Sequence, residues 1–182
     1  MRFIQTTLPG SYVIEQEDIT DERGFFARYF CEKEFSKYDL NLKWVQANNS
    51  CSQNIGTLRG LHFQHPPSAE IKLVRCVNGS IWDVIVDLRA GSSTYGQWFG
   101  ETINSENRKM MYVPRGFAHG TISLEPASEL IYLVSDHYNP KCEGQLLWDD
   151  PDVNIRWPIT PKLISKKDSG GQSLQQIEAI KL

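Results

Sequence analysis

The stretch "IKLVRCVNGSIWDVIVDLR" at residues 71–89 decides the fold class of this 182-residue chain. It holds two runs rich in β-branched and apolar residues, the composition of buried strands, with Asn78-Gly79 between them. Asn-Gly readily supplies the two positive φ angles of a type I′ turn. The stretch therefore predicts a β-hairpin over residues 71–88.

Short β-like runs continue along the chain, with Gly, Pro, Asn or Ser between them, as is typical of a sandwich or small barrel. They are "GQWFGETI" (96–103), "KMMYVPRG" (109–116), "HGTISLE" (119–125), "ELIYLVSD" (129–136) and "GQLLWDD" (144–150). "EKEFSKYD" (32–39) and "SLQQIEAIKL" (173–182) each predict a short helix. Since no repeat or linker interrupts the chain, we expect residues 1–182 to form a single all-β domain with minor short helices.

Composition narrows the classes of partner. The formal net charge is −3 and the isoelectric point about 5.8, so no global basic field favours a nucleic acid. No segment approaches the roughly 20 apolar residues of a membrane span, and "MRFIQTTLPG" (1–10) lacks the apolar core of a signal peptide. Four cysteines without a CxxC pair are expected to be reduced thiols in a cytoplasm. The net charge does not exclude a local basic pocket that binds a small anion such as a nucleotide.

Two histidines, His62 and His65, lie close together in "GTLRGLHFQHPPSAEIK" (56–72). Metal-binding cupins pair an HxH with a later PxGxxH, and "PRGFAH" (114–119) supplies the second half. Residues three apart on a continuous strand point to opposite faces, so the HxxH here does not aim both rings at one metal unless a bulge intervenes. The alternative is a single inward His62, beside inward Gln64 and outward Phe63, acting as a base with an ordinary pKa of about 6.5.

A set of motifs across the chain carries a family resemblance. They are "DERGFF" (21–26), "VQANNS" (45–50), "TLRGLHFQ" (57–64), "KLVRCVNGSIWDVIVDLR" (72–89), "STYGQW" (93–98), "YVPRGFAHG" (112–120), "DDPDVNIRWP" (149–158) and "LISKKD" (163–168). In this order and spacing they resemble the dTDP-4-dehydrorhamnose 3,5-epimerase family of nucleotide-sugar enzymes. The resemblance implies a cupin-like jelly roll or β-sandwich, a homodimer that exchanges N-terminal strands, and catalysis without a metal or another cofactor.

The resemblance also implies a reaction. The substrate is a nucleoside-diphospho-4-keto-6-deoxyhexose, by default dTDP-4-keto-6-deoxyglucose, in deoxysugar and surface-polysaccharide synthesis. The keto group acidifies the protons on C3 and C5, and an enolate forms that needs electrostatic stabilisation. By resemblance His62 is the base, Asp168 orients it, Lys72 lies near the enolate oxygen and Tyr132 is the proton donor.

Further positions match the family's ligand contacts, and arginines among them suit a diphosphate because guanidinium binds phosphate oxygens bidentately. The positions are Arg23, Arg28, Gln46, Asn48, Arg59, His119, Tyr138, Glu143 and Lys167. Arg28 departs from the family, which commonly has glutamate there, and this replacement inverts the hydrogen bonding offered to the nucleotide. The sequence therefore does not decide which nucleotide (dTDP, CDP, UDP or GDP) the substrate carries.

Three alternatives remain at this point. The chain could invert only one centre or act as a ketoisomerase on another sugar nucleotide, since the motifs do not fix how many centres react. It could be a metal-dependent cupin enzyme that uses His62 and His119 as ligands. It could also be a non-catalytic sugar-nucleotide binding module, although binding alone needs no base opposite an acid.

Overall fold

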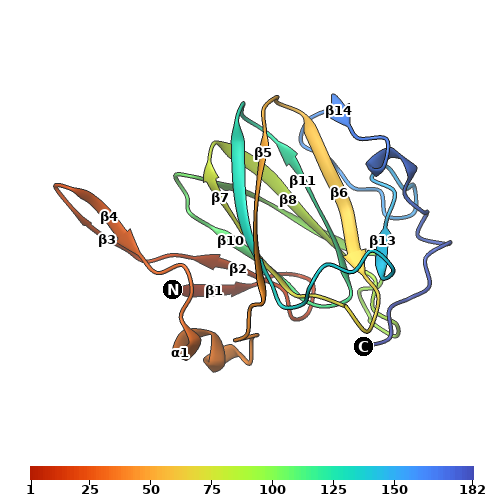
Figure 1. Ribbon diagram of the computed structural model, residues 1–182, viewed down its shortest axis with the longest axis horizontal. Coiled ribbons are helices and arrows are strands. Elements are labelled where there is room, and N and C mark those ends of the chain that lie inside the picture. Colours follow the sequence, from red (N-terminus) through yellow and green to blue (C-terminus); the bar gives the residue numbers. More distant parts are fainter.

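The computed structural model describes residues 1–182 and consists mainly of two packed antiparallel sheets (Figure 1). The first sheet has the strand order β1 (Arg2–Gln5), β2 (Tyr12–Glu15), β10 (Met110–Val113), β7 (Lys72–Asn78), β12 (Ser128–Val134), β5 (Gln46–Ser52). The second has the order β13 (Glu143–Gln145), β6 (Thr57–Gln64), β11 (Phe117–Ser123), β8 (Ser80–Asp87), β9 (Trp98–Asn104), with β14 (Leu163–Ile164) parallel to β6. The predicted all-β sandwich is confirmed.

The hairpin predicted over residues 71–88 is wrong, because β7 and β8 belong to different sheets. Each of them already has a partner on both edges: β7 lies between β10 and β12, and β8 between β11 and β9. Gly79, with a φ of +69°, turns the chain from one sheet to the other. Val74 on β7 and Ile85 on β8 then enter the core between the sheets from opposite sheets.

Alternation along the strands builds three apolar layers. Ile81, Ile85 and Ile103 of the second sheet meet Val74 and Met111 of the first in the layer between the sheets. The outer face of the second sheet buries another layer under the C-terminal part of the chain. A third apolar layer lies on the outer face of the first sheet, where it packs against the short helix α1 (Glu32–Phe35). β8 is consequently buried on both faces.

The two predicted helices have different outcomes. Residues 32–38 form α1 and the 3₁₀ turn η1 (Ser36–Tyr38), so the helix predicted over residues 32–39 is confirmed except for its last residue. The helix predicted over residues 173–182 is wrong. There Ile180 is buried against the second sheet, its backbone N–H donates to Leu88 (2.8 Å), and its carbonyl accepts from Ala90 (2.9 Å). These backbone groups form hydrogen bonds with residues far away in the sequence, so they are not available for the hydrogen bonds of a helix.

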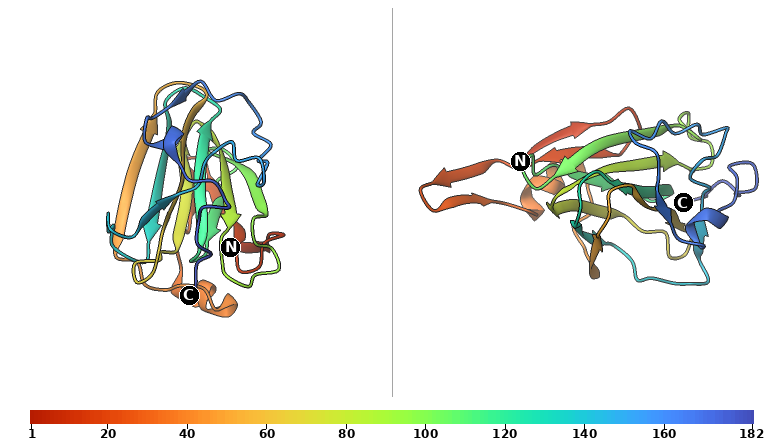
Figure 2. Two further views of the ribbon diagram at one scale, coloured as in Figure 1. Left: turned by 90° about the vertical axis from the view of Figure 1, so that its right-hand side faces the viewer. Right: turned by 90° about the horizontal axis from the view of Figure 1, so that it is seen from above.

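An N-terminal arm extends away from the sandwich in Figures 1 and 2. It is the two-stranded ribbon β3 (Asp18–Asp21) and β4 (Gly24–Ala27). Ile19 and Phe26 are 70% and 63% exposed on it, large values for apolar side chains. As for membrane insertion, none of the helices has the length and apolar character of a bilayer span.

Candidate active site

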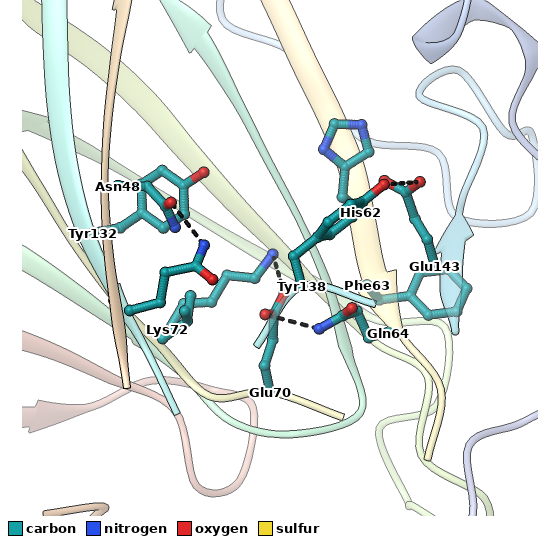
Figure 3. Close-up of a pocket in the computed structure, with 11 residues that line it drawn as sticks. Asn48, His62, Phe63, Gln64, Glu70, Lys72, Tyr132, Tyr138 and Glu143 are labelled. Carbon is teal, nitrogen blue, oxygen red and sulfur yellow. Dashed lines mark hydrogen bonds and ion pairs between the residues drawn. The ribbon is translucent and has the colours of Figure 1, made fainter. Parts of the chain in front are cut away.

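A cavity of about 350 Å³ lies between the two sheets at the β5 and β6 end of the sandwich. Both sheets and the segments next to β6 and β13 contribute to its wall, shown in Figure 3. The lining residues are Gln46, Asn48, His62, Phe63, Gln64, Glu70, Lys72, Tyr132, Val134, Tyr138 and Glu143. A smaller cavity of about 170 Å³ adjoins it and shares His62, Lys72 and Tyr132. Arg59, His119 and Asp168 also line this second compartment.

The register between β5, β12 and β7 places the cavity-lining side chains of the first sheet next to one another. Val134 on β12 is paired with Gln46 on β5 and Lys72 on β7, and Tyr132 is paired with Asn48. Because residues two apart on a strand share a face, these five positions form one wall, which is polar except for Val134. Gln46 and Asn48 are joined within it by an amide–amide hydrogen bond of 2.8 Å.

A bulge in β6 brings Arg59 and His62 to the same side of the second sheet. They are three residues apart and would face opposite ways on a regular strand, but the pairing with β11 shifts between His119 and Thr121. Gly60 lies in this bulge with a φ of +125°, and a Cβ there would come within 2.6 Å of the Gly120 Cα. The bulge precedes His62, so it does not bring His65 inward.

His62 and Asp168 form a close pair. The His62 Nε2 lies 2.7 Å from Asp168 Oδ1, where an Nε2–H donates and leaves the lone pair on Nδ1. Asp168 begins the 3₁₀ turn η2 (Asp168–Gly170), where its own backbone N–H donates to Ser165 Oγ (2.9 Å). Burial lowers the pKa of His62, Asp168 opposes this, and Lys72 adds to the lowering. The imidazole is therefore neutral near pH 7, the state that a base requires.

Tyr132 borders both compartments from the other sheet, and Figure 3 shows it across the cavity from His62. Burial raises the pKa of its phenol, the carboxylate of Glu70 adds to this, and Arg59 opposes it. The phenol stays protonated at neutral pH and can donate a proton.

Lys72 is paired with a carboxylate that the sequence analysis did not assign. Its Nζ lies 3.1 Å from Glu70 Oε1, and the side chains are 10% and 12% exposed. Gln64 Nε2 donates to the other oxygen, Glu70 Oε2, at 3.0 Å. Glu70 was within the quoted stretch 56–72, but it follows the end of β6 and no strand periodicity indicated where it points.

The smaller compartment contains a second histidine–carboxylate pair. His119 Nε2 lies 2.8 Å from Asp83 Oδ2, and Asp83 is fully buried. Sequence reasoning missed Asp83, although an aspartate inside the apolar run of β8 was a usable signal. Arg59 is fixed beside this pair, donating to Ser52 Oγ (3.1 Å) and to the Cys51 carbonyl (3.0 Å).

Three predicted contacts form a cluster at the edge of the larger cavity. Tyr138 Oη donates to Glu143 Oε2 (3.1 Å), and Lys167 Nζ lies 2.6 Å from Glu143 Oε1. Burial would raise the pKa of Glu143, but the hydrogen bonds from Lys167 and Tyr138 together with nearby positive charge lower it below its usual value. Lys167 precedes Asp168 in the chain, so this ion pair ties the segment that carries Asp168 to β13.

Arg23 and Arg28 do not reach either cavity within one chain. Arg23 lies at the turn of the arm and pairs with Asp21 (2.5 Å). Arg28 follows the arm, is 62% exposed at its side chain, and lies 3.4 Å from Glu34. Eleven of the thirteen predicted site residues thus gather around the two compartments, and these two do not.

The histidines are not arranged as metal ligands. His65 follows the end of β6, and its ring packs edge-on against Phe63 at a centroid distance of 5.1 Å. His62 and His119 each direct Nε2 to a carboxylate, and no group of three or more His, Cys, Asp or Glu side chains could hold a metal ion.

Comparisons with known proteins agree with this geometry. The family model described as dTDP-4-dehydrorhamnose 3,5-epimerase matches residues 5–176. An enzyme of that name from Methanothermobacter thermautotrophicus is 43% identical over 178 residues, covering 96% of this chain and 95% of its own. The crystal structure of another from Elizabethkingia anophelis has a TM-score of 0.94 at 39% identity and covers 98% of both chains.

A third relative carries a ligand. The Legionella pneumophila enzyme, solved in complex with dTDP-4-keto-L-rhamnose, has a TM-score of 0.92 at 37% identity and covers 98% of this chain and 95% of its own. The relatives are epimerases, so the predicted family, its cupin-like fold and its isomerase class are confirmed. The chain belongs to the dTDP-4-dehydrorhamnose 3,5-epimerase family.

Proposed function

We propose that this chain epimerises dTDP-4-keto-6-deoxyglucose at C3 and C5, in deoxysugar and surface-polysaccharide synthesis. One observation carries the proposal. A neutral His62 and a protonated Tyr132 border the same cavity from opposing sheets, with the Lys72 ammonium between them (Figure 3). A base and an acid on opposite sides of a sugar ring are what inversion at carbon requires.

The proposed reaction starts with proton removal. His62 Nδ1 takes the proton from a carbon beside the C4 keto group, and the electron pair of the C–H bond moves to the keto oxygen. Lys72 stabilises the resulting enolate oxygen, and Asp168 stabilises the imidazolium that His62 becomes. Tyr132 then donates its proton to the opposite face of the same carbon. Exchange with solvent returns both groups to their starting states.

The remaining predicted residues are proposed as substrate contacts. Arg59, His119, Gln46 and Asn48 present hydrogen-bonding groups around the two compartments. We propose that the cluster of Tyr138, Glu143 and Lys167, joined by hydrogen bonds at the edge of the larger cavity, contacts the nucleotide. No step in this scheme needs a metal, which accords with histidines that already face carboxylates.

We further propose that residues 1–182 form one domain and that the protein is a homodimer which exchanges its N-terminal arms. The support is physical: Ile19, Phe25 and Phe26 expose apolar surface on a ribbon too thin to bury it alone. Packing against a partner would cover this surface and could bring Arg23 and Arg28 to the partner's cavity. We place the protein in the cytoplasm, where its four free cysteines stay reduced.

Proton NMR in D2O tests the function. The purified protein, given dTDP-4-keto-6-deoxyglucose, is expected to replace the C3 and C5 protons with deuterium, and His62→Ala is expected to abolish this while dTDP affinity stays nearly intact. Loss of only one signal would identify a single-centre epimerase. No loss with dTDP, CDP, UDP or GDP forms of the sugar would contradict the proposal, as would an active His62→Ala variant.

A further inference from the structure

Glu70 is the charged residue of the larger cavity with no part in the scheme above. It lies in the connection from β6 to β7, and its side chain is 12% exposed. A carboxylate that far from water is costly unless it is paired and hydrogen-bonded. Its two oxygens have separate partners, Lys72 Nζ at 3.1 Å and Gln64 Nε2 at 3.0 Å.

Gln64 fixes one side of this arrangement to the backbone. Its amide nitrogen also lies within donating distance of the Ser68 carbonyl (3.0 Å) and the His137 carbonyl (3.3 Å). Its amide oxygen accepts from the Asn139 backbone N–H at 2.6 Å. The Gln64 amide is therefore anchored from two connecting segments, and it fixes the carboxylate of Glu70 in turn.

Lys72 is the flexible member of this series. A lysine side chain has a flexible four-carbon stem and loses considerable conformational entropy when its ammonium is held at one point. Lys72 is also 10% exposed, so its ammonium has little water to bind. An anchored carboxylate 3.1 Å away can offset the loss of water and restrict the ammonium to one position.

We propose that Glu70 is a positioning residue, which holds the Lys72 ammonium where the enolate oxygen forms. Glu70 acts through Lys72 and does not itself touch the reacting atoms. The inference rests on the proposed role of Lys72. It adds that the Lys72 cation is positioned before substrate arrives by the series Gln64, Glu70, Lys72, visible as consecutive dashed lines in Figure 3.

A double-mutant cycle on deuterium exchange into dTDP-4-keto-6-deoxyglucose tests this proposal. Glu70→Gln keeps the size of the side chain and removes its charge. We expect kcat to fall about tenfold, as for loss of one charge-assisted contact, while KM changes less than about twofold. In a Lys72→Met background the same substitution should cost less than about twofold, because there is no ammonium left to position. Glu178→Gln, on an exposed carboxylate remote from the cavity, is the matched control.

The outcomes separate the two proposals. An equal loss in both backgrounds would show that Glu70 acts independently of Lys72, and an unchanged kcat in Glu70→Gln would show that it does not act; either overturns the inference while the proposed function stands. Failure of the wild-type protein to exchange deuterium overturns the function and the inference together. If Glu70→Gln does not fold, Glu70→Asp replaces it. Its shortened carboxylate cannot keep both contacts, and the same cycle applies.

Discussion

Replacing Asp168 with asparagine tests the His62–Asp168 pair most directly, because it removes a charge and little volume. The bond is short, 2.7 Å, and the Asp168 side chain is 8% exposed, so solvent screens it weakly. A hydrogen bond to a charged group contributes about 1.5–3 kcal/mol. If that energy stabilises the imidazolium only after it has taken the proton, kcat falls about 10- to 150-fold, at about 1.4 kcal/mol for each factor of ten.

The pH profile gives a second readout with a definite sign. Neutral imidazole is the active form, so the rate rises with pH through the pKa of His62. Burial lowers this pKa in the wild-type protein and the Asp168 carboxylate raises it, which leaves the acid limb below the ordinary value of about 6.5. Asp168→Asn removes the raising contribution, while burial, Lys72 and Lys167 still lower the pKa. The acid limb is therefore expected to move to lower pH as the plateau rate falls.

The assay is the rate of deuterium incorporation into dTDP-4-keto-6-deoxyglucose from about pH 4 to pH 8, with the folded state checked at each pH. Asp149→Asn is the control, since Asp149 is exposed and does not line either compartment. An unchanged plateau would contradict a catalytic role for the pair. Movement of the acid limb to higher pH would show that another group controls it.

Three other substitutions have clear expected outcomes. Tyr132→Phe should slow formation of the epimer on the order of 100-fold while deuterium exchange is less affected, and equal loss of both in NMR time courses would indicate a packing role. Arg28→Glu should change the relative affinities for dTDP, CDP, UDP and GDP measured by calorimetry, and identical affinities would place residue 28 away from the nucleotide. Ile85→Ala, fully buried between the sheets, should reduce the free energy of unfolding in urea by about 2–5 kcal/mol; a loss below about 1 kcal/mol would contradict the packing described.

Local patterns in the sequence predicted the class of fold because strands leave a local signature. Apolar β-branched runs separated by turn residues identified most of β7 to β13, and the polar strand β5 escaped because it lies at a sheet edge. Whether β7 and β8 pair with each other could not be predicted from local pattern in the same way. Asn78-Gly79 specifies a reversal of the chain, but whether the strands pair or face each other depends on distant strands competing for their edges.

The candidate site shows the same division between local and distant information. Alternation put His62 and Gln64 on one face and Phe63 on the other; Phe63 belongs to the outer core under the C-terminal segment, although it also borders the larger cavity. Asp168 lies 106 residues from His62 in a short 3₁₀ turn, and only the family motif indicated it. Arg59 shares the face of His62 because of the bulge at Gly60, which depends on close contact with β11.

Two histidine–carboxylate pairs lie in this interior, and local chemistry alone does not say which is the base. Their positions differ in access to a substrate. His62 is 35% exposed at its side chain, borders both compartments and lies across from Tyr132. His119 is 11% exposed and borders the smaller compartment. A sugar ring needs room to bring C3 or C5 to the base and the opposite face to the acid, and only His62 has that room. With its Nε2–H directed to Asp83, His119 is better placed to accept a hydrogen bond from a sugar hydroxyl at Nδ1, a contact that requires a single fixed approach.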